Sequence, residues 1–409
     1  MNRRISRLAA DTLAAGAASA VILGAQCLRY SSPFIDAVTG LSPEGISLLY
    51  PWTYILLAPM SGLTDMWTFN SPQQHITWGI TLVLAYWLAR PFGSWRKAAL
   101  FYPAYILSLV SFLAWGALFP RPTARIQIDD PDILAVDFHS HTTHSHDGRR
   151  FPPFYTPMRN IEWHRAQGFG AGFITDHNVV AGALEAKDAS NSKPGYRSLA
   201  GTELSLHDSH ILSIGNDTYV DNKKYSDGLE GIRRFLSESE VRYDSLSVLS
   251  LPEYWKHHWN RLEDFAGWGV DGLELENAAP KALAFPEASK RAVIALARKH
   301  NLFLVGVSDS HGWGSATYAW SLMKIPGHAA MSAEDLENAV IRRLKDGGFN
   351  AVRVLTRRKA RPNGMLQLLL EPIVGLWVLF RTLTFPLALS WIAWIWGLRL
   401  FFRRKKAMS

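Results

Sequence analysis

The sequence predicts an α/β domain, with a parallel sheet or barrel, between two apolar ends that have the character of membrane segments. In the middle of the chain, about residues 126–355, short apolar runs alternate with helical patterns, as in parallel sheets and barrels. Polar clusters follow these apolar runs, as functional groups follow the strands of a barrel. The first 120 residues and the last 45 instead carry long uncharged runs rich in Trp and Leu.

Six apolar runs of the middle region are predicted to be strands, and they span residues 133–138, 172–175, 197–203, 246–251, 272–276 and 303–307. Between them, the patterns predict helices over residues 158–167, 229–237 and 287–299. A further helix is expected to begin near residues 332–335 and to end at Gly347 and Gly348, because polar caps start helices and glycines end them.

The stretch DFHSHTTHSHDG, residues 137–148, follows the apolar run ILAV. His139 and His141 are two residues apart, so on an extended strand both side chains point to the same face and can bind one ion. Asp147 follows in a turn. Aspartate with alternating histidines is ligand chemistry for zinc, iron or manganese. The competing interpretation is a solvated loop with chance histidines.

Four further polar clusters occur at predicted strand ends. They contain Asp176 and His177 in FITDHN; Glu203 and His210 in GTELSLHDSHIL; Glu274, Glu276 and Asn277 in DGLELEN; and Asp309 and His311 in VGVSDSH. Each cluster alone fits a helix cap or a surface carboxylate. Because five clusters share equivalent strand ends, we expect them to converge on one pocket. His146, His164 and His207 are either solvent-facing or orient the ligands.

Four of these motifs, DFHSHTTHSHDG, ITDHN, GTELSLHDSHIL and VSDSH, resemble in order the metal-binding motifs of the PHP (polymerase and histidinol phosphatase) superfamily, over about residues 132–354. The resemblance implies a distorted seven-stranded (β/α) barrel that binds two or three divalent ions (Zn, Mn or Fe) and hydrolyses phosphate esters. It implies one ion on His139, His141, Glu203 and Asp309, a second on Glu203 and His210, and a third on Asp147, His177 and His311. Asp309, Glu203 and His210 would then be catalytic through a metal-activated water.

One position departs from the resemblance. The family has a histidine before a proline at the end of a strand, and here Leu251 precedes Pro252. Since leucine cannot bind a metal, the second ion is weakened, absent, or completed by water, by His257 or His258, or by a carboxylate. His144 stands where the family tends to have an aromatic residue, and its role is open.

The expected substrate is a phosphate ester: a small molecule, a nucleotide or a lipid phosphate. Arg149 and Arg150 follow the first motif and are candidates for binding phosphate oxygens, with ordinary surface arginines as the alternative. The net charge is +8, and the basic residues cluster beside apolar runs, which suits membrane lipids and predicts no stable nucleic-acid binding. The one cysteine, Cys27, excludes an internal disulfide and a cysteine-rich metal site.

Two other classes of function remain open. A metal-binding sensor or scaffold of the membrane, without catalysis, is favoured by Leu251. A transporter is disfavoured because the apolar spans show no run of charges that would line a path. The prediction is a membrane-anchored phosphoesterase with a membrane region over residues 1–125, a hydrolase domain over 126–356, and a basic juxtamembrane stretch with C-terminal membrane segments over 357–409.

The expected location is a bacterial inner membrane, which the chain would cross several times. The first helix after MNRRISR is an uncleaved span or a secretory signal. The other candidate spans are residues 46–63, 75–89, 98–119, 365–380 and 382–398. Pro51 and Pro59 could make residues 46–63 kinked or re-entrant, and residues 365–380, with Glu371 and Pro372, could lie in the interface instead. Three N-terminal spans and one C-terminal span would put the hydrolase domain outside. Four N-terminal spans and two C-terminal spans would put more basic residues inside, including the cluster at 353–361. This second count favours a cytoplasmic hydrolase domain.

Overall fold

The computed structural model describes residues 2–89, 94–148, 154–312, 314 and 316–408. Within these residues, ten strands form one mixed sheet in the order β1-β12-β11-β4-β5-β6-β7-β8-β9-β10. The strands are β1 (Phe34–Asp36), β4 (Ile133–Asp137), β5 (Ala171–Ile174), β6 (Arg197–Leu206), β7 (Ser209–Ile214), β8 (Leu246–Leu249), β9 (Gly272–Asn277), β10 (Phe303–Val307), β11 (Ala319–Lys324) and β12 (Arg353–Arg357). All six predicted strands are present.

The sheet curls until its last strand meets its middle. The amide of Asp309, after β10, donates to the carbonyl of His139 at 2.9 Å, and the amide of His141 donates to the carbonyl of Ser310 at 2.9 Å. The predicted barrel is therefore right in its curled α/β character, but the sheet is not made of seven parallel strands. One reason is the β6–β7 hairpin, where His207 and Asp208 take positive φ of 39° and 56°, so a tight turn replaces a crossover helix.

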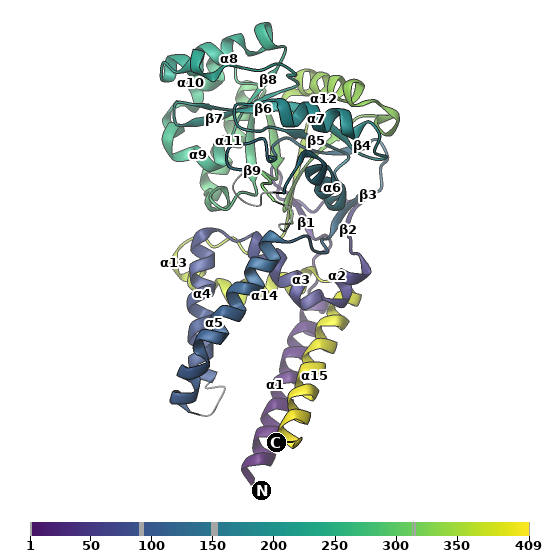
Figure 1. The fold of residues 1–409 in the computed structure, drawn as a ribbon, viewed down its shortest axis with the longest axis vertical. Helices are drawn as coiled ribbons and strands as arrows, with labels where there is room; N and C mark the ends of the chain where they lie inside the picture. Colours follow the sequence, from purple (N-terminus) through teal and green to yellow (C-terminus); the bar gives the residue numbers. More distant parts are fainter. Residues whose placement is uncertain (1, 90–93, 149–153, 313, 315, 409) are drawn as a thin grey trace.

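Helices cover the outside of the sheet (Figure 1). They include α6 (Pro157–Gln167), α7 (Ala181–Ser190), α8 (Leu229–Tyr243), α9 (Leu251–His258), α11 (Glu287–His300) and α12 (Ala333–Gly347). Each predicted helix is present, and α7 and α9 were not predicted. The amphipathic α12 buries Leu336, Val340 and Leu344 against the sheet, as residues at i, i+4 and i+8 on one helix face must.

Two pairs of helices extend away from the sheet: α1 (Asn2–Cys27) lies beside α15 (Phe385–Met408), and α4 (Pro72–Ala89) precedes α5 (Trp95–Leu118) in the other pair (Figure 1). The N- and C-termini lie together at the far end of the first pair. Of the helices that the structure describes, α5 alone is both long and apolar enough to cross a membrane by length and composition. Among the described helices, length and composition therefore agree with the expected membrane spans only at α5.

Two of the candidate spans are not continuous helices. Residues 46–63 form β2 (Ile46–Leu49), α2 (Trp52–Leu56) and the start of α3 (Ala58–Thr68), because β2 pairs with β3 (Arg125–Ile128) and a proline opens each helix. Residues 365–380 are divided at Leu370 into α13 (Met365–Leu369) and α14 (Glu371–Thr382).

A buried ion cluster joins the helical region to the sheet. Asp65 of α3 lies 2.7 Å from Arg121, just after α5, and 2.9 Å from Arg357 at the end of β12. The hydroxyl of Tyr54 donates to the same carboxylate at 2.9 Å. Since a buried carboxylate needs such partners, this cluster fixes α3 and the end of α5 against the sheet.

Candidate metal centre

A cavity of about 750 Å³ opens where the central strands end. Around it, three groups of His, Asp and Glu bring their ligand atoms within 4.8 Å of one another. The groups are His139, His141 and Asp309; His177, Glu203 and His210; and His141, Asp147, His177 and His311. The eight residues that the sequence singled out as metal ligands thus lie together, from segments up to 172 positions apart, the separation of His139 and His311.

The first group lies deepest. The Nε2 atoms of His139 and His141 are 3.0 Å apart, and Oδ1 of Asp309 lies 3.2 Å from His141 and 3.6 Å from His139. Asp309 follows β10 with a φ of +46°, a left-handed conformation that turns its side chain toward the two imidazoles. All three residues are buried.

Glu203 joins the first group to the second. Its Oε2 lies 3.1 Å from His139 Nε2 and 3.3 Å from His141 Nε2, and its Oε1 lies 2.7 Å from His210 Nδ1. His177 Nδ1 is 3.2 Å from Oε2. One carboxylate thus faces four imidazoles, a position suited to a ligand shared by two cations.

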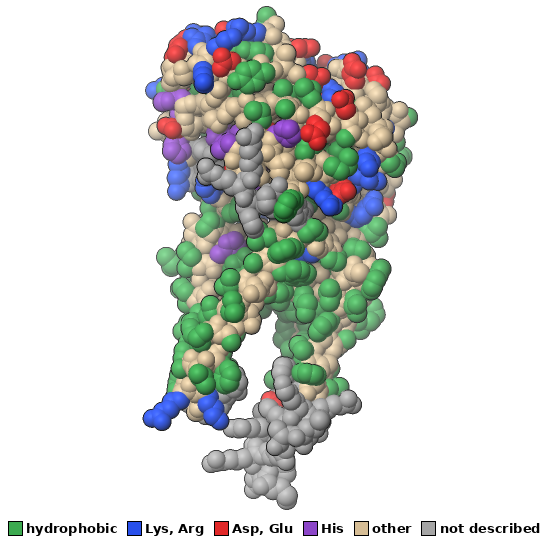
Figure 2. All heavy atoms as spheres, viewed as in Figure 1, with side chains coloured by type: hydrophobic (Ala, Val, Ile, Leu, Met, Phe, Trp, Pro, Cys, Tyr) green, Lys and Arg blue, Asp and Glu red, His purple; other side chains and the backbone are tan. Residues whose placement is uncertain are grey.

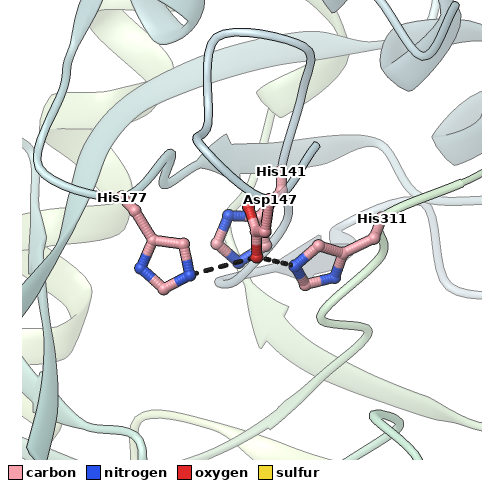
Figure 3. A group of neighbouring side chains, drawn as sticks. All are labelled: His141, Asp147, His177 and His311. Atoms are coloured by element: carbon pink, nitrogen blue, oxygen red, sulfur yellow. Dashed lines mark hydrogen bonds and ion pairs between the residues drawn. The ribbon is translucent and has the colours of Figure 1, made fainter. Parts of the chain in front are cut away.

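The third group is more open. Asp147 lies between two histidines in Figure 3, with its Oδ2 at 3.2 Å from His177 Nε2 and 2.7 Å from His311 Nε2. The ring of His141 stacks on that of His311 with centroids 4.1 Å apart, so His141 borders both the first and the third group. The side chain of Asp147 is one-third exposed, which gives this group access to the cavity.

A further layer of side chains orients the ligands. Glu274, fully buried on β9, lies 2.7 Å from His139 Nδ1 and accepts from Ser250 and from Asn277. With Nδ1 of His139 bound to a carboxylate, its Nε2 is the atom presented to the cavity. The sequence placed Glu274 and Asn277 at a strand end but did not identify this role.

A second orienting network lies behind the first motif. Asp137 lies 2.9 Å from His164 Nε2 and accepts from the amide of Ser308 at 3.0 Å. His164 is therefore an orienting residue rather than a solvent-facing one. Asp176 accepts from the amide and the hydroxyl of Thr142 at 2.6 and 2.7 Å, which fixes the loop that follows His141.

The electrostatics follow from burial and crowding. Burial would lower the pKa of His141, but the nearby carboxylates of Asp309 and Glu203 outweigh it and raise that pKa to about 10. Burial would likewise raise the pKa of Glu203, but the imidazoles of His139 and His177 hold it well below the ordinary value. The pKa of His177 is lowered, chiefly by burial. The metal-free site therefore retains protons that ligation must displace.

The residues fit divalent metal ions. Nδ1 of His141 and Oδ1 of Asp309 are buried and make no hydrogen bond within the described structure, although Oδ1 faces two imidazoles. Buried polar atoms are nearly always satisfied, and a cation among the facing nitrogens and oxygens would satisfy Oδ1. Imidazole and carboxylate donors suit zinc, iron or manganese.

The remaining sequence predictions have different outcomes. Leu251 begins α9 and is packed in the apolar core. His177, rather than a residue at position 251, lies beside Glu203 and His210. Of the alternatives for completing the second ion, His257 and His258 are not favoured, because both line a separate cavity with His207. His144 pairs with the exposed Glu185 at 3.0 Å.

Two further predictions concern the rim of the site. The ring of His146 lies 4.7 Å from that of His177 and lines the main cavity. Arg149 and Arg150 lie outside the described residues. Trp67 and His75 line the cavity from the helical region. They could not be predicted as site residues, because neither belongs to a polar cluster that follows a predicted strand.

Comparison with known proteins gives structural similarities only. No family model matches the chain, and no curated protein matches it. A candidate metal-dependent phosphoesterase from Bifidobacterium adolescentis is 19% identical, with 44% of this chain and 88% of that chain covered and a TM-score of 0.32. An amidohydrolase from Chromobacterium violaceum, with bound sulfate and no metal, is 16% identical (50% and 96% covered, TM-score 0.34). PsfC from Pseudomonas syringae is 16% identical (59% and 96% covered, TM-score 0.37).

Proposed function

We propose that this protein is a membrane-anchored, metal-dependent hydrolase that cleaves phosphate esters, most simply monoesters. The observation that carries the proposal is the position of Glu203, whose two oxygens contact His210 on one side and His139 and His141 on the other. Adjacent cation sites that share a carboxylate are suited to phosphoryl chemistry, in which attacking and leaving oxygens both carry negative charge. The motif resemblance supports the same reaction class.

The chain's own residues would position the reaction. When bound, the ions would polarise the phosphate oxygens and lower the pKa of a water. Glu274 fixes the tautomer of His139, and Asn277 contacts both Glu274 and Asp309, at 2.9 and 3.2 Å, so these ligands are held before substrate arrives. Apolar residues on the opposite cavity wall would exclude bulk water.

We further propose that α1, α4, α5 and α15 anchor the protein in a membrane. The hydrolase domain would then lie on the side away from the cytoplasm, in contrast to the cytoplasmic side that the count of four and two spans favoured. The ends of these helices that lie far from the sheet carry Arg3, Arg4 and Arg7, then Arg96 and Lys97, and then residues 403–406. Basic side chains mark the far end of the α4–α5 pair in Figure 2. Because positive charge favours the cytoplasmic side, this arrangement supports three N-terminal spans and one C-terminal span.

The proposed reaction is tested with the full-length protein in nanodiscs, stripped by a chelator and reloaded with Zn²⁺, Mn²⁺ or Fe²⁺. We expect release of inorganic phosphate from phosphate monoesters with at least one of these metals, and none after chelation. An absence of turnover with every metal and ester would contradict the proposal. A cysteine introduced in place of Arg96, with Cys27→Ser, should react with a membrane-impermeant thiol reagent only from the cytoplasmic side.

The second candidate is a metal-binding sensor without catalysis. Leu251 favours it, because this leucine stands where the family that the motifs resemble has a metal-binding histidine. In that case the same preparation would bind ions but release no phosphate from any ester.

A further inference from the structure

We infer that the substrate is a lipid phosphate, an ester whose phosphate meets the metal centre while its hydrocarbon chain lies against the helical region. This inference rests on the proposed phosphoesterase function and adds the substrate class. It is carried by the construction of the cavity, which joins the strand ends to the apolar helices.

The cavity has two chemically different walls. The sheet and the loops that follow its strands contribute the ligand groups that contain His141, Glu203 and Asp309. The rest of the lining includes Trp67 of α3, Ala117 and Leu118 at the end of α5, apolar side chains of the loop over residues 278–280 and Ala316, with Thr68, His75 and Lys281 among its polar members. A phosphate alone would use only the first wall, whereas an amphiphile would use both.

The helices that reach this cavity continue its apolar wall outward. His75, in the first turn of α4, lines the cavity, and the exposed residues Ile76, Ile80, Leu84 and Leu88 lie at intervals of four on the adjoining face of the same helix. Leu118 is the last residue of α5, the helix apolar enough to span a membrane. Figure 2 shows patches of apolar side chains along this pair, and a hydrocarbon chain in the bilayer could lie against them on the way to the cavity.

The end of α5 is also fixed to the loop that carries a ligand. Arg121, just after α5, donates through its Nε–H to two carbonyls, those of Gly116 and Gly314, each at 2.9 Å. A Cβ on Gly314 would lie 2.4 Å from the backbone of Ala117, so glycine permits this close approach. Gly314 is three residues after His311, and the apolar wall is therefore held in place relative to the metal centre.

The reaction would be hydrolysis of one P–O bond. Water supplies the oxygen of the new P–O bond, the alkoxy oxygen leaves with a proton as the alcohol, and inorganic phosphate is released. The alcohol retains the hydrocarbon chain and returns to the bilayer, whereas phosphate leaves to water. No oxidant, reductant or further substrate is needed.

The first experiment measures kcat/KM for n-alkyl phosphates from ethyl to octyl, with the metal-loaded full-length protein in nanodiscs. Each CH₂ that enters the apolar wall should raise kcat/KM roughly three- to four-fold, so the octyl-to-ethyl ratio should reach at least about 100. Turnover with equal kcat/KM across the series would overturn the lipid inference alone. An absence of turnover for every ester would instead count against the proposed phosphoesterase function.

Matched variants separate cavity binding from simple partition of long chains into the nanodisc. Trp67→Ala and Leu118→Ser should each lower the octyl-to-ethyl ratio about five- to ten-fold. The controls, Trp52→Ala and Leu107→Ser, alter exposed side chains of α2 and α5 that do not line the cavity and should keep the ratio. A ratio that is the same in all four variants would contradict the inference, because partition alone would then explain the preference.

A binding experiment gives a readout that does not depend on activity. A dodecylphosphonate with a diazirine near the chain end, a probe that cannot be hydrolysed at a P–O–C bond, is photo-crosslinked to the full-length protein and mapped by mass spectrometry. We expect crosslinks in α3 around Trp67 and at the C-terminal end of α5, reduced by excess dodecyl phosphate. Crosslinks confined to the α1–α15 pair, or not displaced by competitor, would overturn the inference.

Discussion

The Nε2 atoms of His139 and His141 face each other at 3.0 Å, and Oε2 of Glu203 lies within 3.3 Å of both. Two imidazoles can approach in this way only if at least one of the facing nitrogens carries a lone pair. A cation between them would allow both nitrogens and the carboxylate to act as ligands. Oδ1 of Asp309 faces the same two imidazoles and would be a further ligand of that cation.

Asp309→Asn should lower the phosphatase activity by more than about 100-fold, because replacing even residues that only orient ligands usually costs 10- to 100-fold. The measurement is phosphate release under saturating metal. Asp264→Asn is the matched control, since Asp264 is a partly exposed carboxylate paired with Arg261 at 3.0 Å. Equal activity of the two variants would remove Asp309 from the centre.

Glu274→Gln should weaken metal binding about 10- to 100-fold, because Glu274 orients His139 through Nδ1 at 2.7 Å. Its neighbour on β9 provides a contrast. Glu276 pairs with Lys290 at 2.7 Å, and its pKa is lowered to about 2 because Lys290 and Arg361 outweigh burial. Glu276→Gln should therefore reduce the free energy of unfolding by about 3–5 kcal/mol and leave metal affinity unchanged. Metal titration and denaturant unfolding of both variants test the distinction.

The metal-free protein should lose stability as the pH rises. The pKa of His141 is raised from 6.5 to about 10, so its stabilising contribution is complete below pH 6.5 and is lost as pH approaches 10. Metal binding displaces this proton, and metal affinity should therefore increase over the same range. The difference in unfolding temperature between metal-loaded and chelated protein should widen between about pH 6.5 and about pH 9. A constant difference would show that His141 does not exchange a proton for metal.

Asp65→Asn should destabilise the join between the helices and the sheet by about 3–5 kcal/mol, because Arg121 and Arg357 would lose their buried counter-charge. Limited proteolysis and thermal unfolding in nanodiscs measure the effect. Glu230→Gln, which breaks an exposed pair with Arg233, should leave the unfolding temperature and the proteolysis pattern unchanged, because water screens such pairs. Similar unfolding of the two variants would contradict the role assigned to Asp65.

The residues of the centre could be predicted because metal chemistry limits them to a few side-chain types at strand ends. His139, Glu203 and Asp309 each follow or end an apolar run, and parallel strand ends meet at one edge. The position of His177 beside Glu203 could not be predicted, because it depends on how the segment after β5 pairs with β6 at Glu203. Glu274 was found as a strand-end carboxylate, but its partner lies 135 residues away.

The order of the strands in the sheet was harder to predict from the sequence than the residues of the metal centre. β11 and β12 pair antiparallel beside β4, and the register that brings them there is set by tertiary packing rather than by their own patterns. In the helical region, hydropathy alone suggested a span over residues 46–63. Hydropathy could not show that β2 pairs with β3, a strand about 80 residues later, because strand pairing depends on the partner as well as on the segment itself.

The central claim is that histidines and carboxylates from distant segments bind divalent ions together. It is tested most directly by the number of ions bound per full-length chain, measured by equilibrium dialysis and elemental analysis for the native protein and for Asp309→Asn. We predict two or three ions on the native chain and at least one fewer on the variant. A native chain that retains no ion, or a variant that binds the same number as the native chain, would contradict the claim.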